Sequence, residues 1–245
     1  MMPMPTDARR SWFRGMSLEL KVHKQPMAWL ALLLFAVYVL SILLSDPARP
    51  RNVYYFSEMA MFSLALILPL LLFQREIGGG GMEVIATYPV SLSMLAFRKW
   101  LLAIVLTAAL AVLLMSVYAW HFGGIWTLRY PWNGAEAIPK AEMNAASLML
   151  QNLPAYVLLI SLSIAGIVAF RRIYGGLILG FAVWVLDTIS SGEWLGRWTL
   201  YASYLRKHHS FPENRIGLLI ASLLLLAFAV WLIGRRERWI SVEEE

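Results

Sequence analysis

Two acidic residues lie inside long apolar runs of this 245-residue sequence, and they are the first candidates for chemistry. Glu58 and Asp187 each fall near one end of such a run. A charge inside a bilayer is costly and usually serves a function, so the two carboxylates are candidates to line a translocation path for a cationic substrate. The simpler interpretation, which the sequence favours, places both at the headgroup level, where water reaches them.

Other reactive groups do not form a recognisable site in the sequence. The chain has no cysteine, which excludes disulfides, thiolate metal ligands and cysteine nucleophiles. The four histidines (His23, His121, His208 and His209) lack the partners and spacing of a metal site. Motifs of serine hydrolases, zinc proteases and phosphate-binding loops are also absent. We therefore predict no catalytic residue, no metal and no cofactor. If ATP drives this protein, another polypeptide binds it.

The composition indicates which elements must position these residues. Hydrophobic residues make up 60% of the chain and charged residues 15%, against about 25% charged in soluble domains. A membrane-spanning helix needs about 20 apolar residues, and only helices satisfy the backbone within lipid for such segments. We predict an all-α, polytopic membrane protein forming a single membrane domain over residues 1–245. Its six spans are expected at residues 27–44, 54–73, 100–120, 153–170, 173–189 and 216–233.

The distribution of basic residues predicts the orientation. Six spans place both termini on one side, and that side carries thirteen of the 21 Lys and Arg residues. Both termini, including the tail 234–245, are therefore predicted to be cytoplasmic in a plasma membrane, which we take to be bacterial. In the N-terminal tail 1–26, Trp12, Phe13, Met16 and Leu20 alternate with basic residues. This pattern predicts a helix lying on the membrane lipids.

The predicted cytoplasmic loop between the second and third spans is the most informative segment. Four consecutive glycines, residues 78–81, break any regular helix. Residues 82–88 can then form a short helix that ends before Pro89, and a further helix begins at residues 90–91 and enters the third span. A short helix on a glycine hinge, parallel to the membrane, is suited to docking in the groove of a partner protein.

The order of residues in this loop resembles the permease subunits of type-2 ABC transporters. The resemblance rests on Glu76, Gly81, Met82, Glu83, Pro89, Val90, Ser91 and Lys99. It implies that the short helix is a coupling helix, which binds a dimer of cytosolic ATP-binding cassette subunits. It also implies a second permease subunit, identical or a sister chain, and export of an amphipathic peptide, drug or lipid-linked molecule. Two positions depart from the family pattern, with Met82 in place of Thr and Arg98 in place of Gly.

Two other classes of function remain open from the sequence. The chain could be a membrane scaffold or sensor whose loop recruits a partner that is not an ATPase. It could also be an intramembrane enzyme that uses Glu58, Asp187 or His121. Nucleic acid is not an expected partner, because the basic residues are dispersed between apolar runs. The aromatic-rich segment 190–215 is either a set of short re-entrant helices or a simple loop at the membrane interface.

Overall fold

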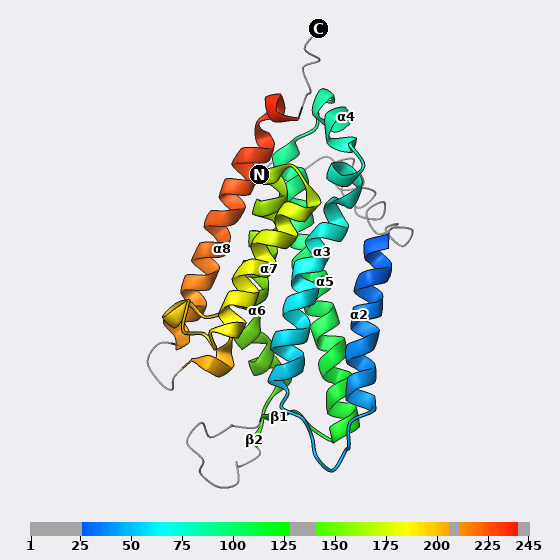
Figure 1. Cartoon of the computed structure of the whole chain (residues 1–245), viewed down its shortest axis with the longest axis vertical. Helices are drawn as coiled ribbons and strands as arrows, with labels where there is room; N and C mark the ends of the chain where they lie inside the picture. Colours follow the sequence, from blue (N-terminus) through cyan, green and yellow to red (C-terminus); the bar gives the residue numbers. More distant parts are fainter. Residues whose placement is uncertain (1–25, 128–140, 206–210, 240–245) are drawn as a thin grey trace, which may run out of the picture.

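The computed structural model describes residues 26–127, 141–205 and 211–239, which form a bundle of long helices (Figure 1). The predicted interfacial helix in residues 1–26 lies almost wholly outside the described residues. The α-helices are α2 (Pro26–Leu43), α3 (Met61–Phe73), α4 (Gly81–Thr87), α5 (Leu92–Phe122), α6 (Ala145–Phe170), α7 (Ile173–Ile189) and α8 (Phe211–Gly234). Two π-helices, η2 (Tyr55–Ala60) and η3 (Gln74–Gly78), extend α3 at its two ends.

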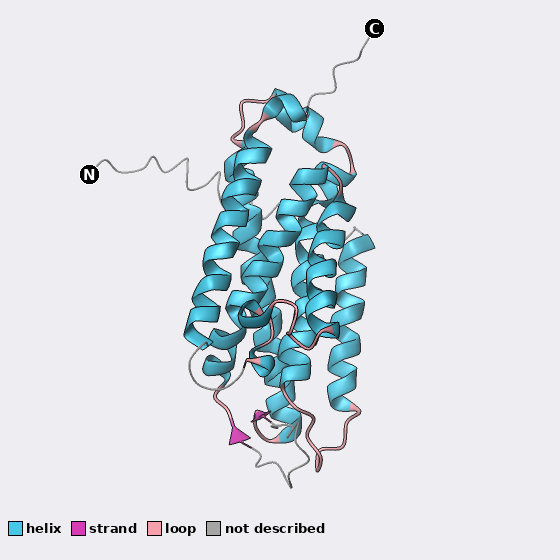
Figure 2. Ribbon diagram, turned by 60° about the vertical axis from the view of Figure 1, so that its left-hand side comes forward, coloured by secondary structure: helices cyan, strands magenta, loops and turns pink. Residues whose placement is uncertain are grey.

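The remaining described elements are short. Three 3₁₀ turns are η4 (Gly196–Trp198), η5 (Ala202–Tyr204) and η6 (Arg236–Arg238). Strands β1 (Trp126–Thr127) and β2 (Ala141–Glu142) form one small antiparallel pair. We call the end of the bundle that carries α4 and η6 the α4 end, and the opposite end, which carries β1 and β2, the β end (Figure 2).

Helices α3 and α6 form the centre of the bundle. Helix α6 packs against α3, α5, α7 and α8, whereas α2 lies at the edge beside α3 and α5 (Figure 1). Every residue of α3 is apolar except Ser63, and nearly all are buried, because helices surround it. Small residues bring α6 and α7 together: a Cβ added at Gly176 would lie 2.4 Å from the backbone oxygen of Ser163. The close approach of α6 and α7 therefore depends on glycine at this position.

Five described helices are long and apolar enough to cross a membrane: Pro26–Leu43, Tyr55–Gly78, Leu92–Phe122, Ala145–Phe170 and Phe211–Gly234. This agrees with the predicted polytopic helical membrane protein. Helix α7 is apolar but has only 17 residues, about 25 Å at 1.5 Å per residue, against a hydrocarbon core of about 30 Å. The sixth crossing therefore stays a prediction.

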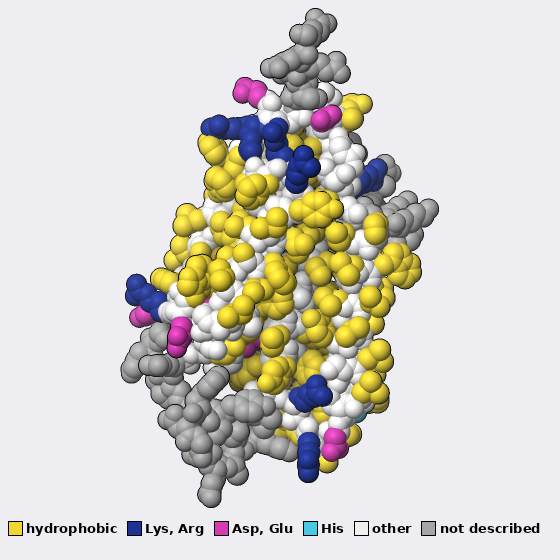
Figure 3. Space-filling model, in the orientation of Figure 1, with side chains coloured by type: hydrophobic (Ala, Val, Ile, Leu, Met, Phe, Trp, Pro, Cys, Tyr) yellow, Lys and Arg dark blue, Asp and Glu magenta, His cyan; other side chains and the backbone are white. Residues whose placement is uncertain are grey.

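The surface has the distribution of side chains that suits a bilayer. In Figure 3, hydrophobic side chains cover most of the middle of the visible face, whereas basic side chains gather at the α4 end and others lie at the left edge and near the β end. Large apolar residues in the middle of several helices are exposed, among them Leu33, Leu113, Ile178 and Leu224. Soluble monomers rarely expose apolar patches of this extent, whereas lipid tails cover them in a membrane.

Candidate functional site

The glycine run forms a tight turn between η3 and α4 at one end of the bundle. Gly80 has a positive φ of 70°, a conformation that glycine adopts without the steric cost of a side chain. At Gly79, an added Cβ would lie 2.9 Å from the backbone oxygen of Arg75, so the chain folds back closely on itself. The turn sets the direction in which α4 leaves the bundle.

Helix α4 has a buried and an open face. Met82 and Ala86, one turn apart, are buried, with exposed fractions of 2% each. Glu83 and Val84 lie on the open face, and Val84 is 59% exposed. No described residue forms a salt bridge with Glu83. The helix thus presents one carboxylate and an apolar side chain to its surroundings.

Helix α4 ends within one residue of the end predicted from the sequence, residue 88. Tyr88 adopts an extended conformation, as the residue before a proline tends to do, and α4 ends at Thr87. The Ser91 hydroxyl then caps α5 by accepting a hydrogen bond from the Met94 amide, at 3.3 Å. Tyr88 is 59% exposed and Val90 is 47% exposed, so the apolar surface continues past the helix.

Arg236 holds the end of α4 from the other side. Its guanidinium donates hydrogen bonds to the backbone oxygens of Ala86 (3.2 Å), Tyr88 (2.9 Å) and Val90 (2.8 Å). The last carbonyls of a helix have no partner within it, and a cation placed there also interacts favourably with the helix dipole. Arg236 lies just after α8, so these bonds tie α4 to the last long helix.

Two further arginines, Arg171 and Arg238, join the segment after α8 to the turn between α6 and α7. Arg238 donates to the backbone oxygen of Ala169 at 3.1 Å, and Arg171 donates to the backbone oxygen of Arg238 at 2.7 Å. Trp239 is buried, and its indole nitrogen donates to the backbone oxygen of Ile233. The segment after α8 therefore links α4, α8 and the α6–α7 turn.

A buried ion pair supports α4 from below. Lys99 Nζ of α5 lies 2.9 Å from Glu76 Oε1 of η3 and also donates to the backbone oxygen of Leu72. The Lys99 ammonium lies over the ring of Phe73, 5.2 Å from its centroid. The pair fixes the end of the long helix Tyr55–Gly78 to α5. The family resemblance did not imply this structural role for Glu76 and Lys99.

The eight residues of the predicted coupling segment thus divide into two sets. Four are exposed around the open face: Glu83, Pro89, Val90 and Ser91. The other four lie in the supporting turn or against the bundle: Glu76, Gly81, Met82 and Lys99. Only the first set is free to meet a partner.

Glu58 and Asp187 lie together with the segment that follows α7, near the β end. Glu58 Oε1 accepts hydrogen bonds from the backbone amides of Ala202 (2.7 Å) and Ser203 (3.2 Å), and Oε2 accepts one from the Ser203 hydroxyl (2.6 Å). Asp187 Oδ2 accepts from the Thr199 hydroxyl and the Leu200 amide, at 2.9 and 2.8 Å.

The expectation that water reaches these carboxylates is wrong. Glu58 is 1% exposed and Asp187 is 0% exposed. The physical reason is that residues 199–203 fold back onto the bundle and place backbone and hydroxyl donors against both carboxylates. A buried carboxylate needs such donors, because desolvation without them is costly.

The start of α8 holds the same segment. Asn214 donates to the backbone oxygens of Arg197 (2.7 Å) and Thr199 (3.0 Å), and Arg215 donates to that of Leu200 (3.1 Å). Residues 199–203 are therefore fixed by side chains from η2, α7 and α8. The described part of the aromatic-rich segment contains two 3₁₀ turns, η4 and η5.

Tyr201 forms a further connection in this segment. Its hydroxyl accepts from the Trp184 indole at 2.9 Å and lies 2.7 Å from the Thr188 hydroxyl. Burial raises the pKa of Tyr201 to about 12, and these hydrogen bonds offset part of that rise. The phenol is thus neutral at physiological pH.

Of the four histidines, the structure describes only His121. His121 Nε2 lies 2.9 Å from the backbone oxygen of Ser45, which places it in a structural contact. His23, His208 and His209 lie outside the described residues. Within the described ranges, no three His, Asp or Glu side chains gather as a metal site.

Sequence reasoning missed the residues that hold these segments in place. The missed residues are Arg236, Arg215 and Asn214, which flank the last apolar run. This position beside the run is the one feature of the sequence that could have indicated their role. Their acceptors are backbone oxygens, which no sequence pattern reveals.

Comparisons of the chain with models of protein families, with curated proteins and with solved structures find no match. The class that the fold and the composition support is a polytopic helical membrane protein.

Proposed function

We propose that this chain is the permease subunit of an ATP-driven transporter resembling the type-2 ABC exporters. A separate cytosolic ATP-binding subunit would dock on the open face of α4, formed by Glu83, Val84, Tyr88 and Val90. One observation carries the proposal: α4 extends beyond the long helices (Figure 1), with one face packed on the bundle and the other open. This open face places the apolar side chains of Val84, Tyr88 and Val90 beside the Glu83 carboxylate, as a docking surface requires.

The contacts of α4 give a route by which movement of the partner would reach the long helices. Arg236 ties the end of α4 to α8, and the Lys99–Glu76 pair ties the preceding turn to α5. A partner can transmit work only if it binds α4 differently in its open and closed states. Pushing α4 would then displace α5 and α8 together.

The proposal includes six crossings with both termini in the cytoplasm. The bonds from Arg236 to α4 and from Arg238 to Ala169 place the ends of α6 and α8 at the α4 end. The chain must therefore return to the β end between them, and α7 begins this return. The short α7 fits a bilayer through slight local thinning, at modest cost.

The proposed assembly contains two permease subunits, identical or sister chains, and a dimer of ATP-binding subunits. This chain itself would hydrolyse nothing. The substrate class, an amphipathic peptide, drug or lipid-linked molecule, follows from the family resemblance. Glu58 and Asp187, fixed on residues 199–203, would shape the β end of the path rather than bind cargo directly.

Affinity purification from native membranes tests the proposal. We expect an ATP-binding cassette protein to co-purify with the tagged wild-type chain. Glu83→Lys should reduce its recovery about tenfold, because it replaces the carboxylate of the open face with a cation. Glu193→Lys, the same change at an exposed site away from α4, serves as the matched control.

Equal recovery with both variants would overturn the assignment of α4. Co-purification of a protein without a nucleotide-binding site, dependent on Glu83, would favour the membrane scaffold instead. Turnover of lipid or peptide by the purified chain alone would favour the intramembrane enzyme.

A further inference from the structure

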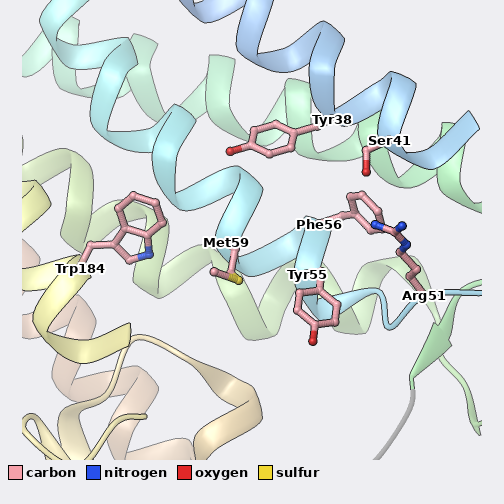
Figure 4. A pocket seen from close by; sticks show the side chains of 7 residues that line it. All are labelled: Tyr38, Ser41, Arg51, Tyr55, Phe56, Met59 and Trp184. Carbon is pink, nitrogen blue, oxygen red and sulfur yellow. The ribbon is translucent and has the colours of Figure 1, made fainter. Parts of the chain in front are cut away.

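A lateral pocket of about 530 Å³ lies between α2, η2 and α7 near the β end. Its size falls within the roughly 300–1,000 Å³ of small-molecule sites in proteins. Figure 4 shows the side chains that line it, which are mostly aromatic. They are Tyr38, Ser41, Arg51, Tyr55, Phe56, Met59 and Trp184.

Among the described residues that line the pocket, the one charged side chain, Arg51, lies at one end (Figure 4). Arg51 lies at one end of the group, on Ser41's side, and Trp184 lies at the other (Figure 4). Arg51 belongs to the turn after α2, whereas Tyr38 lies within α2, almost one turn before Ser41. Arg51 therefore lies closer to the β end of the bundle than Tyr38 does. A lipid in the leaflet at the β end would place its headgroup near Arg51 and its acyl chains toward Trp184.

Hydrogen bonds and ring contacts fix the walls. The Tyr38 hydroxyl lies 3.0 Å from the Ser63 hydroxyl, and the Trp184 indole donates to Tyr201. The ring of Phe56 packs on Tyr118, with 5.7 Å between centroids. Fixed walls reduce the entropy lost on binding, because little rearrangement is needed.

The charge at the polar end has no partner within the described chain. Arg51 is exposed, and no described residue forms a salt bridge with its guanidinium. The Asp46 carboxylate, which belongs to the same turn, accepts a hydrogen bond from the Ala48 amide. A guanidinium presents a planar fork of donors that matches a phosphate group.

From this geometry we propose that the pocket binds one anionic phospholipid. The phosphate lies at Arg51, and an acyl chain lies against Tyr38, Phe56 and Met59. The inference requires only that the bundle lies in a membrane, so it is independent of α4 and of any ATP-binding partner.

Lipid retention measured by native mass spectrometry tests the headgroup contact. The full chain is reconstituted in nanodiscs of equal phosphatidylglycerol and phosphatidylcholine, then extracted, and the bound lipids are counted. We expect the wild type to retain one phosphatidylglycerol in preference to phosphatidylcholine. Arg51→Gln should lower that preference about three- to fivefold, as for one ionic contact at a partly exposed site.

Arg49→Gln is the matched control, because it removes the same charge from the same turn outside the pocket. We expect it to leave the preference unchanged. An equal effect of the two variants, or equal retention of both lipids by the wild type, would show that the turn attracts anions without a site and would overturn the proposal.

Filling the pocket tests the acyl contact. Ser41→Trp and Met59→Trp add bulk from opposite walls and keep the charge of Arg51. We expect each to abolish retention of the bound lipid, with the helix content by circular dichroism unchanged. Full retention in both folded variants would place the lipid elsewhere and contradict the assignment.

Discussion

At the scale of single residues, a few buried or capping charges hold segments that apolar packing alone would leave loose. Lys99 joins the end of the second long helix to α5 through Glu76, and Arg236 joins α4 to the end of α8. Removing one partner of such a contact costs more than the contact itself contributes, because the other partner stays buried and unpaired. The two contacts can therefore be tested separately.

Arg236→Gln is expected to loosen α4 by about 1 kcal/mol, because it removes hydrogen bonds to the backbone oxygens at the end of the helix and just after it. Hydrogen exchange of the amides of residues 82–90 should then be about fivefold faster, since exchange follows local opening. Arg235→Gln is the control, because it removes the same charge from the neighbouring position, where the guanidinium lies over the ring of Trp231. Equal exchange in the two variants would show that α4 is held without Arg236.

Lys99→Met should destabilise the bundle by about 3 kcal/mol, because it leaves the Glu76 carboxylate without its cation. The double variant Lys99→Met/Glu76→Leu should recover part of that loss, since it removes both charges. Thermal unfolding in detergent measures both effects. Additive losses in the double variant would mean that the ion pair contributes nothing.

At the scale of elements, the segment after α7 is built into the bundle rather than lying on its surface. Glu58 accepts hydrogen bonds from two backbone amides of this segment. Replacing Glu58 by Leu would leave those two donors buried without an acceptor. Each lost acceptor costs about 1–3 kcal/mol. The π-helical geometry of η2 places this carboxylate, and π-helical turns are frequent at functional sites.

Glu58→Leu is therefore expected to expose residues 199–203, with at least tenfold faster exchange of the Ala202 and Ser203 amides. Glu58→Gln should keep these amides protected, because its side-chain oxygen still accepts both bonds. If Glu58→Gln instead abolished transport with the amides protected, the charge itself would act on the cargo. Unchanged protection in Glu58→Leu would contradict the holding role.

The sequence predicted elements better than it predicted contacts. Pro89 and the glycine run predicted the limits of α4 closely, because proline and glycine act on the local backbone. It also predicted a helix that begins at residues 90–91 and enters the third span, and α5 begins at Leu92. It did not predict that the fourth long helix, α6, would begin eight residues before its apolar run, at Ala145. Ser91 and Asn144 cap these helices, which continue through polar residues beyond the spans. The burial of Glu58 depended on donors about 145 residues away, which no local pattern encodes.

At the scale of the whole molecule, the proposed function requires that the α4 end of the bundle faces the cytoplasm, where an ATP-binding subunit can reach it. We expect a cysteine at Thr87, exposed on α4, to react with an impermeant thiol reagent only in opened cells. A cysteine at Ala48, exposed in the turn after α2, should react in intact cells. The cysteine-free chain provides the background for both variants. The reverse labelling pattern would overturn the predicted orientation and, with it, a cytosolic partner at α4.

Site-specific photocrosslinking from α4 in native membranes tests the central proposal most directly. A benzophenone amino acid at Val84, on the open face, is expected to form an adduct with a protein that contains a phosphate-binding loop, identified by mass spectrometry. The same probe at Leu186, an exposed apolar position near the β end, should form no such adduct. An adduct at Val84 with a protein lacking a nucleotide-binding site, or with lipid alone, would contradict the proposal that an ATP-binding subunit docks on α4.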